Sequence, residues 1–203
     1  MKTALLLSGG MDSTSLAWWK RPDVAYTVDY GQLAAGAERQ ASAAICRILG
    51  IAHEVLTLDA RALGSGDMAG TVADTHAPAS DWWPYRNQFL ITLVAMRAVA
   101  AGVNHLWIGT VASDGTHLDG TPSFVDAMSH LLSCQEGSLK VSAPAIEMST
   151  TELIGASGIP RDVLAWAHSC HKADVPCGQC RGCNKYYQVL HELDSNVDLA
   201  IES

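Results

Sequence analysis

A short apolar run near the start of the chain ends directly in two glycines, and this order constrains the fold more than any other stretch. Residues 3–7 read as a buried strand, Ser8-Gly9-Gly10 as a turn, and residues 13–20 as a helix. Adjacent glycines let backbone N–H groups crowd toward an anion, and the helix N-terminus adds unpaired donors and a positive dipole end. The sequence therefore predicts a phosphate-binding turn between a strand and a helix.

This turn differs from the ordinary P-loop, because no Lys-Ser/Thr pair follows the glycines. It instead resembles the pyrophosphate loop of ATP pyrophosphatases, which cleave ATP between the α and β phosphates to adenylate a substrate. That resemblance implies an ATP site and, at Asp12, an oxygen ligand for Mg²⁺ beside a phosphate. The alternative is a glycine turn that binds nothing. The residues assigned to ATP here are Ser8, Gly9, Gly10, Met11, Asp12, Ser13 and Thr14.

A second motif near the C-terminus combines closely spaced cysteines with glycines that permit tight turns. Four thiolates can close a tetrahedral cage around Zn²⁺, and a cage without a water position is structural rather than catalytic. An iron–sulfur cluster is an alternative for such spacing. Disulfides are another, but no secretory leader is predicted, because the glycine loop interrupts the N-terminal apolar run. The predicted zinc ligands are Cys170, Cys177, Cys180 and Cys183.

Taken together, the two motifs resemble those of the 7-cyano-7-deazaguanine synthase family, the nitrile-forming enzymes of the queuosine pathway. Four further segments resemble family motifs: Val28-Asp29-Tyr30-Gly31-Gln32, Trp83-Pro84-Tyr85-Arg86-Asn87, Ile108-Gly109-Thr110 with Ser113-Asp114, and Ala143-Pro144. The resemblance implies ATP-dependent adenylation of the carboxylate of 7-carboxy-7-deazaguanine and amide formation with ammonia. A second ATP then activates the amide, and loss of AMP leaves the nitrile. It also implies a homodimer.

On this resemblance, Asp29 and Tyr30 join the nucleotide site, and Asp12, Arg86 and Asp114 are the predicted catalytic residues. Arg86 is the predicted charge clamp on a phosphate or on the substrate carboxylate. Asp114, together with His117 and Asp119, either orients substrate or ammonia or belongs to a solvated loop.

The chain departs from the family pattern where charged groups are expected. Leu33-Ala34 stands in place of Arg-His, Ala112-Ser113 lacks a glutamate, His171 replaces a tyrosine, and Ser149-Thr150-Thr151-Glu152 keeps a glutamate but lacks a lysine. Four cations are candidates to substitute: Arg86, Lys172, Arg181 and Lys185. A paralogue with another acid or amine acceptor is therefore an alternative. A tRNA sulfur-transfer enzyme and a nucleotide sensor without turnover are two more.

Composition favours an enzyme that acts on a small molecule. Thirteen Lys and Arg against 21 Asp and Glu give a formal net charge of −8, which disfavours a nucleic-acid partner. A hydrophobic content of 48% excludes a disordered chain. The most apolar predicted helix, residues 89–103, is interrupted by Arg97 and is too short to span a membrane. We expect a cytoplasmic protein.

Strands and helices alternate along the chain, with strands at 3–7, 24–29, 54–58 and 105–109 and helices at 13–20, 36–49, 86–101 and 123–134. This order predicts an α/β fold with a doubly wound parallel sheet, Rossmann-like and of the adenine nucleotide alpha hydrolase type that the resemblance implies. Ligands then bind at the carboxyl ends of the strands.

We assign residues 1–145 to a nucleotide-binding α/β domain and 146–203 to a small helical zinc-knuckle module. From residue 140 the chain is predicted to run into short helices at 149–156 and 160–168, with a last helix at 184–193. The residues between 60 and 85 form a long loop, typical of a lid or a disordered segment. Trp82 and Trp83 in this loop either clamp a purine-like ring or pack in the core.

Overall fold

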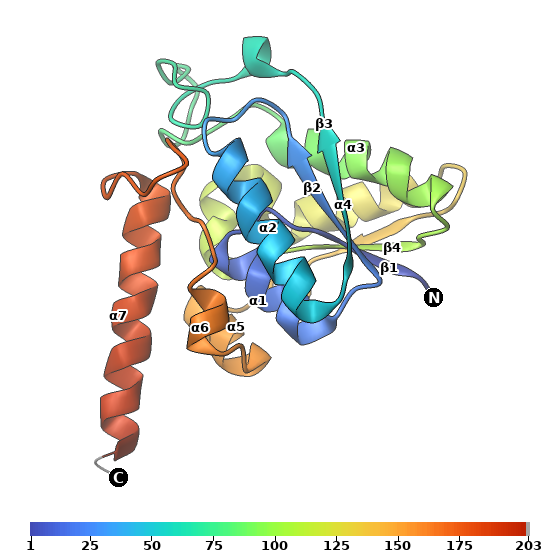
Figure 1. Cartoon of the computed structure of the whole chain (residues 1–203). Helices are drawn as coiled ribbons and strands as arrows, with labels where there is room; N and C mark the ends of the chain where they lie inside the picture. Colours follow the sequence, from blue (N-terminus) through green and yellow to red (C-terminus); the bar gives the residue numbers. More distant parts are fainter. Residues whose placement is uncertain (202–203) are drawn as a thin grey trace.

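The computed structural model describes the backbone of residues 1–201 and the side chains of residues 1–195 (Figure 1). At its centre lies a five-stranded parallel sheet in the order β3-β2-β1-β4-β5. The strands are β1 (Thr3–Leu6), β2 (Val24–Asp29), β3 (Ala52–Thr57), β4 (His105–Ile108) and β5 (Lys140–Ser142). The predicted doubly wound α/β fold is confirmed.

Each face of the sheet contributes to a separate apolar core, because side chains alternate along β1. Ala4 and Leu6 belong to the core under α3 (Arg86–Ala100) and α4 (Pro122–Ser133). Leu5 and Leu7 point to the opposite face, into the core under α1 (Met11–Lys20) and α2 (Ala35–Leu49). Helices thus cover both faces, which is why the buried central strands are almost continuously apolar.

The C-terminal elements pack on the α1 side of the sheet. They are α5 (Thr150–Ser157), α6 (Arg161–Leu164) and α7 (Arg181–Ile201). Ile154, Leu164 and Val189, one from each, are buried in the same core as Leu5 and Leu7. In Figure 1, α7 runs along the side of the molecule and its C-terminal part extends beyond the body. The domain boundary at 145 stays a prediction.

Local capping signals explain where α4 and α5 begin. Thr121 accepts a hydrogen bond from the backbone N–H of Phe124, and Pro122 takes the first position of α4. Ser149 and Glu152 form a capping box at the start of α5, as their spacing predicts. The helix predicted from residue 13 begins two residues earlier, since Gly10 is the N-cap of α1.

The bounds of three predicted elements and one missing strand need correction. Residues 140–142 form β5, because pairing with β4 stabilises a strand too short to show a sequence period. The strand predicted at 54–58 is Ala52–Thr57, and the helix predicted at 160–168 ends at Leu164. The last helix begins at Arg181 rather than 184, since the final cysteine turn is already helical, and it continues past 193.

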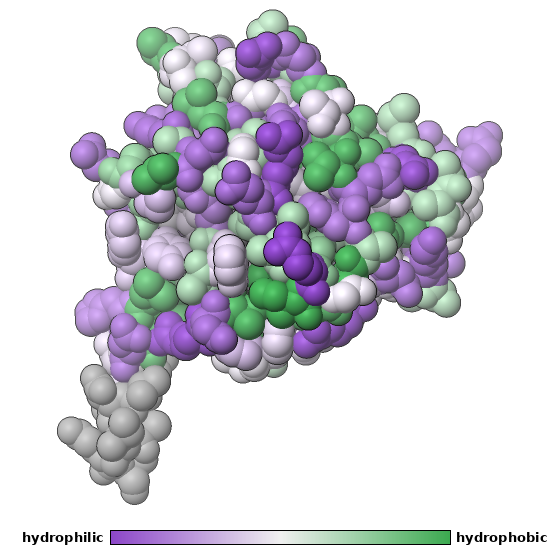
Figure 2. All heavy atoms as spheres, in the orientation of Figure 1, coloured by the Kyte–Doolittle hydropathy of each residue, from purple (hydrophilic) through white to green (hydrophobic). Residues whose placement is uncertain are grey.

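The face seen in Figure 1 carries hydrophilic and hydrophobic side chains side by side, with one hydrophobic group at its lower centre (Figure 2). Within residues 1–201, no helix combines the length and the apolar character needed to cross a membrane.

Candidate functional site

A cavity of about 620 Å³ opens at the carboxyl ends of β1 and β4. The strand order reverses between these two strands, and such a switch point is where open parallel sheets bind ligands. The volume lies in the range of small-molecule sites. Eight of the predicted site residues line it: Ser8, Gly10, Met11, Asp12, Ser13, Tyr30, Arg86 and Asp114.

Three other predicted nucleotide-site residues, Gly9, Thr14 and Asp29, are not among the residues that line the cavity. Gly9 has φ +78°, and a Cβ there would come within 2.8 Å of the Glu38 carbonyl oxygen, so it lets the loop press against α2. Thr14 is fully buried in α1, and Asp29 forms an ion pair with Arg39 at 3.2 Å. Their part in nucleotide binding stays a prediction.

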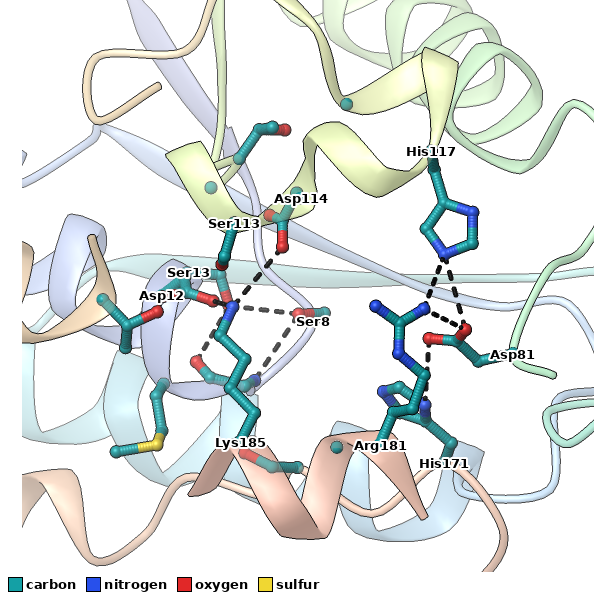
Figure 3. Close-up of a pocket in the computed structure, with 18 of the residues that line it drawn as sticks. Ser8, Asp12, Ser13, Asp81, Ser113, Asp114, His117, His171, Arg181 and Lys185 are labelled. Atoms are coloured by element: carbon teal, nitrogen blue, oxygen red, sulfur yellow. Dashed lines mark hydrogen bonds and ion pairs between the residues drawn. The ribbon is translucent and has the colours of Figure 1, made fainter. Parts of the chain in front are cut away.

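The loop after β1 presents the N-terminus of α1 to the cavity. No side chain caps this terminus at Gly10. The hydroxyls of Ser8 and Ser13 lie 3.1 Å apart at the rim (Figure 3). Gly109 at the end of β4 allows a close approach, since a Cβ there would lie 2.9 Å from the Ser13 Cα. Uncapped N–H groups, hydroxyl donors and the helix dipole together suit an anion.

Two carboxylates and one ammonium group gather beside this helix N-terminus. The Lys185 Nζ lies 2.9 Å from Asp12 Oδ2 and 3.4 Å from Asp114 Oδ1 (Figure 3). The Thr150 hydroxyl donates to Asp12 Oδ1 at 2.6 Å. Burial raises the pKa of Asp12 above its ordinary value, although the charge of Lys185 opposes this. The Asp12 carboxylate is thus poorly hydrated and depends on cations for its charge.

A second ionic group lies further along the cavity, around the buried carboxylate of Asp81. Arg181 Nη1 donates to Asp81 Oδ1 at 2.8 Å, and His117 Nε2 lies 3.4 Å from the same oxygen (Figure 3). His171 approaches the other oxygen at 3.4 Å. Burial alone would raise the pKa of Asp81, but the hydrogen bond with His117 and the charges of His171 and Arg181 bring it below the usual range.

The wall near α2 and α3 holds Glu38, Arg86 and Tyr30. Burial raises the pKa of Glu38 to about 7, although Gln32 Nε2 donates to its carboxylate at 2.7 Å. The ring of Tyr30 packs edge-to-face on Trp83 with ring centroids 4.9 Å apart. Trp83 is buried in the core, and it is not among the described residues that line the cavity. This favours packing in the core over a purine clamp as the role of Trp83.

The four predicted metal-ligating cysteines meet at the start of α7, next to the cavity. Their sulfur atoms all lie within 4.8 Å of one another, so the cluster can hold a metal ion. The Cys170–Cys180 and Cys177–Cys183 sulfur pairs are separated by 3.9 and 4.0 Å. Metal–sulfur bonds of about 2.3 Å in a tetrahedron place sulfurs about 3.8 Å apart, which fits. Backbone N–H groups of His171 and Cys183 also donate to Cys180 Sγ.

Sequence reasoning missed Glu38 and Asp81, because neither lies in a recognisable motif. It also assigned no role to Thr150, although Thr150 lies in the segment Ser149-Thr150-Thr151-Glu152 that was compared with the family pattern. Lys185 was one of four candidate cations, and it is the one that contacts Asp12. Lys172 instead pairs with Asp67 at 3.1 Å, and it is not among the residues lining the cavity. Asp119 accepts a hydrogen bond from the Asn87 backbone N–H, which ties the loop after β4 to the start of α3.

Comparisons with known proteins bear on this geometry. The family model described as "Queuosine biosynthesis protein QueC" matches residues 2–194. A 7-cyano-7-deazaguanine synthase of Desulforudis audaxviator is 32% identical, with 91% of this chain and 94% of that protein covered. One from Methanosarcina barkeri is 29% identical, with 90% of each covered.

Among solved structures, an NMN synthetase from Francisella tularensis matches with a TM-score of 0.51 and 16% identity, covering 96% of this chain and 77% of that one. This likeness concerns the fold alone. The match of the family model over nearly the whole chain decides the family. The chain belongs to the QueC family of queuosine biosynthesis proteins.

Proposed function

We propose that this chain is an ATP-dependent 7-cyano-7-deazaguanine synthase, the activity for which its relatives are named. One observation carries the proposal beyond family membership. The uncapped N-terminus of α1 opens into a cavity beside the carboxylate of Asp12. This arrangement suits a polyphosphate with its metal ion, and the cavity leaves room for a second ligand.

Ser8, Gly10, Met11 and Ser13 would bind the phosphates through their backbone N–H groups and hydroxyls. Asp12 and Asp114 offer the carboxylate oxygens that Mg²⁺ prefers. Mg²⁺ would neutralise charge on the departing pyrophosphate. The protein's share of catalysis is then to hold the acid in line with the α-phosphorus and to stabilise developing negative charge.

Arg86 and Arg181 both line the cavity and are the candidate partners for the carboxylate of 7-carboxy-7-deazaguanine. Adenylation converts this carboxylate into a mixed anhydride with AMP, and pyrophosphate leaves. Ammonia displaces AMP to give the amide, and a second adenylation followed by loss of AMP gives the nitrile. The two oxygens of the acid leave with the two AMP molecules, so the sequence needs no oxidant or reductant.

For the cysteine cluster we propose Zn²⁺. The sulfur separations suit a tetrahedral site, and four protein ligands leave no open position for water. The metal would stabilise the turn that leads into α7. Thiolate ligands and ATP both suit a reducing, ATP-containing compartment, the cytoplasm. A homodimer stays a prediction from the family resemblance.

The test is incubation of the purified protein with Mg-ATP, ammonium and 7-carboxy-7-deazaguanine, followed by mass spectrometry of the base and quantification of AMP. We expect the nitrile with two AMP per product. A reaction that stops at the adenylate, with pyrophosphate but no AMP released, or at the amide, with one AMP per product, would indicate a paralogue with another acceptor. Bound ATP with release of neither pyrophosphate nor AMP would indicate a nucleotide sensor and contradict the enzyme proposal.

Metal analysis of the same preparation tests the remaining alternative, a tRNA sulfur-transfer enzyme. We expect one zinc per chain and a colourless protein. A brown protein containing iron and sulfide would instead favour a sulfur-transfer enzyme with a cluster at the cysteines.

A further inference from the structure

Helix α7 extends two cations into the cavity from one face. Arg181 and Lys185 are four residues apart, so their side chains emerge about 5–6 Å from each other on the same side of the helix. Figure 3 shows them reaching toward different partners, Arg181 toward Asp81 and Lys185 toward Asp12 and Asp114. The helix is thus attached to the cavity through two separate ionic contacts.

The Lys185 contact differs from the Arg181 contact in its charge arrangement and in the freedom of its side chain. Lys185 places a single positive charge between two carboxylates, at distances of 2.9 and 3.4 Å. No guanidinium fork fixes its direction, because an ammonium group is a point charge on a flexible four-carbon stem. The side chain is 34% exposed, so it can move along the cavity without unpacking the helix.

A divalent ion and the Lys185 ammonium group compete for the same oxygens. An oxygen-coordinated Mg²⁺ sits about 2.0–2.1 Å from its ligands, so it cannot share Asp12 Oδ2 with an ammonium group at hydrogen-bond distance on the same side. Entry of the metal therefore displaces Lys185. The N-terminus of α1, with the Ser8 and Ser13 hydroxyls, lies directly beside the displaced group.

We propose that Lys185 holds the place of Mg²⁺ between Asp12 and Asp114 in the nucleotide-free protein, and that it turns to the phosphates when Mg-ATP binds. The inference rests on the proposed ATP-dependent function and adds a phosphate ligand from α7. The exchange keeps the carboxylates neutralised in both states. It also makes metal binding without nucleotide unfavourable, because the metal must displace an ion-paired cation.

The test uses the whole 203-residue chain with metal bound at the cysteine cluster, as wild type and as the variant Lys185→Met. This variant keeps the approximate length of the side chain and removes its charge. Mn²⁺ binding without nucleotide is followed by electron paramagnetic resonance, and Mg-ATP binding by calorimetry. We expect Mn²⁺ to bind the variant about ten-fold more tightly and Mg-ATP about ten-fold more weakly. Lys185→Arg keeps the charge and is expected to recover part of the affinity for Mg-ATP.

The matched control is Lys172→Met, which removes a cation from the same module without touching the cavity. Lys172→Met should change neither the affinity for Mn²⁺ nor the affinity for Mg-ATP. Adding Asp12→Asn to Lys185→Met should abolish the tighter Mn²⁺ binding, which locates the metal. Unchanged Mn²⁺ affinity in Lys185→Met would overturn the exchange, even if ATP binding weakens. If the wild-type protein binds no nucleotide, the proposed function fails instead, while the Mn²⁺ comparison still tests the place of Lys185.

Discussion

The cysteine cluster and the cavity at the strand ends are built in opposite ways. All four sulfur ligands come from residues 170–183, and three of the cysteines are almost completely buried. The cavity is lined by residues from Leu6 to Glu192 and stays open. A closed set of four ligands stabilises structure, whereas an open cavity with charged walls binds exchangeable ligands.

The two regions are nevertheless connected through α7. Cys180 and Cys183 alternate in the sequence with Arg181 and Lys185, and these two cations face the cavity. The cluster therefore positions part of the cavity, whereas the cavity contacts the sulfurs through His171, whose backbone N–H donates to Cys180 Sγ. We expect a substitution in the cysteine cluster to disturb ligand binding in the cavity, and a substitution in the cavity to leave metal binding at the cluster unchanged.

Breaking the cluster should have the largest effect. Cys180→Ser removes one sulfur ligand, and we expect loss of the metal, a fall of about 5 kcal/mol or more in the free energy of unfolding, and loss of nucleotide binding. Metal analysis and urea unfolding measure this. Cys134→Ser changes an exposed cysteine outside the cluster and serves as the control. A Cys180→Ser protein of wild-type stability would contradict the structural role of the metal.

Asp12→Asn tests the reverse direction. We expect turnover to fall by about 100-fold or more, because the proposed phosphate site would lose its proposed metal ligand and that ligand's charge. Metal content at the cysteines and the urea midpoint should stay near wild-type values, since Asp114 still faces Lys185. Asp126→Asn, on the exposed side of α4, is the control. Loss of the cysteine-bound metal in Asp12→Asn would show that a change in the cavity also disturbs the cysteine cluster.

Asp81→Asn tests the ionic contact that joins α7 to the loop before α3. We expect a loss of about 2–3 kcal/mol in the free energy of unfolding, because Arg181 and His117 lose a buried charged partner. Urea unfolding at neutral pH measures it. The exposed pair Arg61–Asp59 supplies the control, since Asp59→Asn should change stability little. An equally small effect at Asp81 would mean that the cysteine cluster, the Lys185 contact and the apolar packing of Val189 hold α7 without this ionic contact.

Glu38→Gln should have the smallest effect, and the size of this effect depends on pH. Burial raises the Glu38 pKa from 4.5 to about 7, so the fold prefers the protonated carboxyl group. The stability that this preference contributes is complete below pH 4.5 and is lost as pH rises to about 7.

The uncharged variant should therefore match the wild type in acid and exceed its unfolding free energy by about 1–2 kcal/mol at pH 8. This is less than the roughly 3.4 kcal/mol that a pKa rise from 4.5 to about 7 corresponds to, because Glu38 lines the open cavity and keeps partial solvent exposure. Urea unfolding at pH 4 and pH 8 measures the difference. A difference that does not change with pH would contradict the raised pKa.

Local signals in the sequence determined the strand–glycine–helix loop, the capping box at Ser149 and the four cysteines. Each depends on residues close together in the chain, so a pattern of residue types is enough to recognise it. The alternation of apolar segments likewise determined the parallel sheet and the edge at which the cavity opens. The three-residue strand β5 could not be predicted, because its stability comes from pairing with β4.

Only the tertiary structure decided which charges meet. Lys185 lies 173 positions from Asp12 and Arg181 lies 100 from Asp81, and no sequence pattern links such partners. Packing of α7 on the α1 side of the sheet brings them together. Tertiary structure also placed Trp83 in the core and Asp29 outside the cavity lining. The physical reason is that burial and ion pairing depend on the surroundings in space, whereas sequence motifs report only neighbours along the chain.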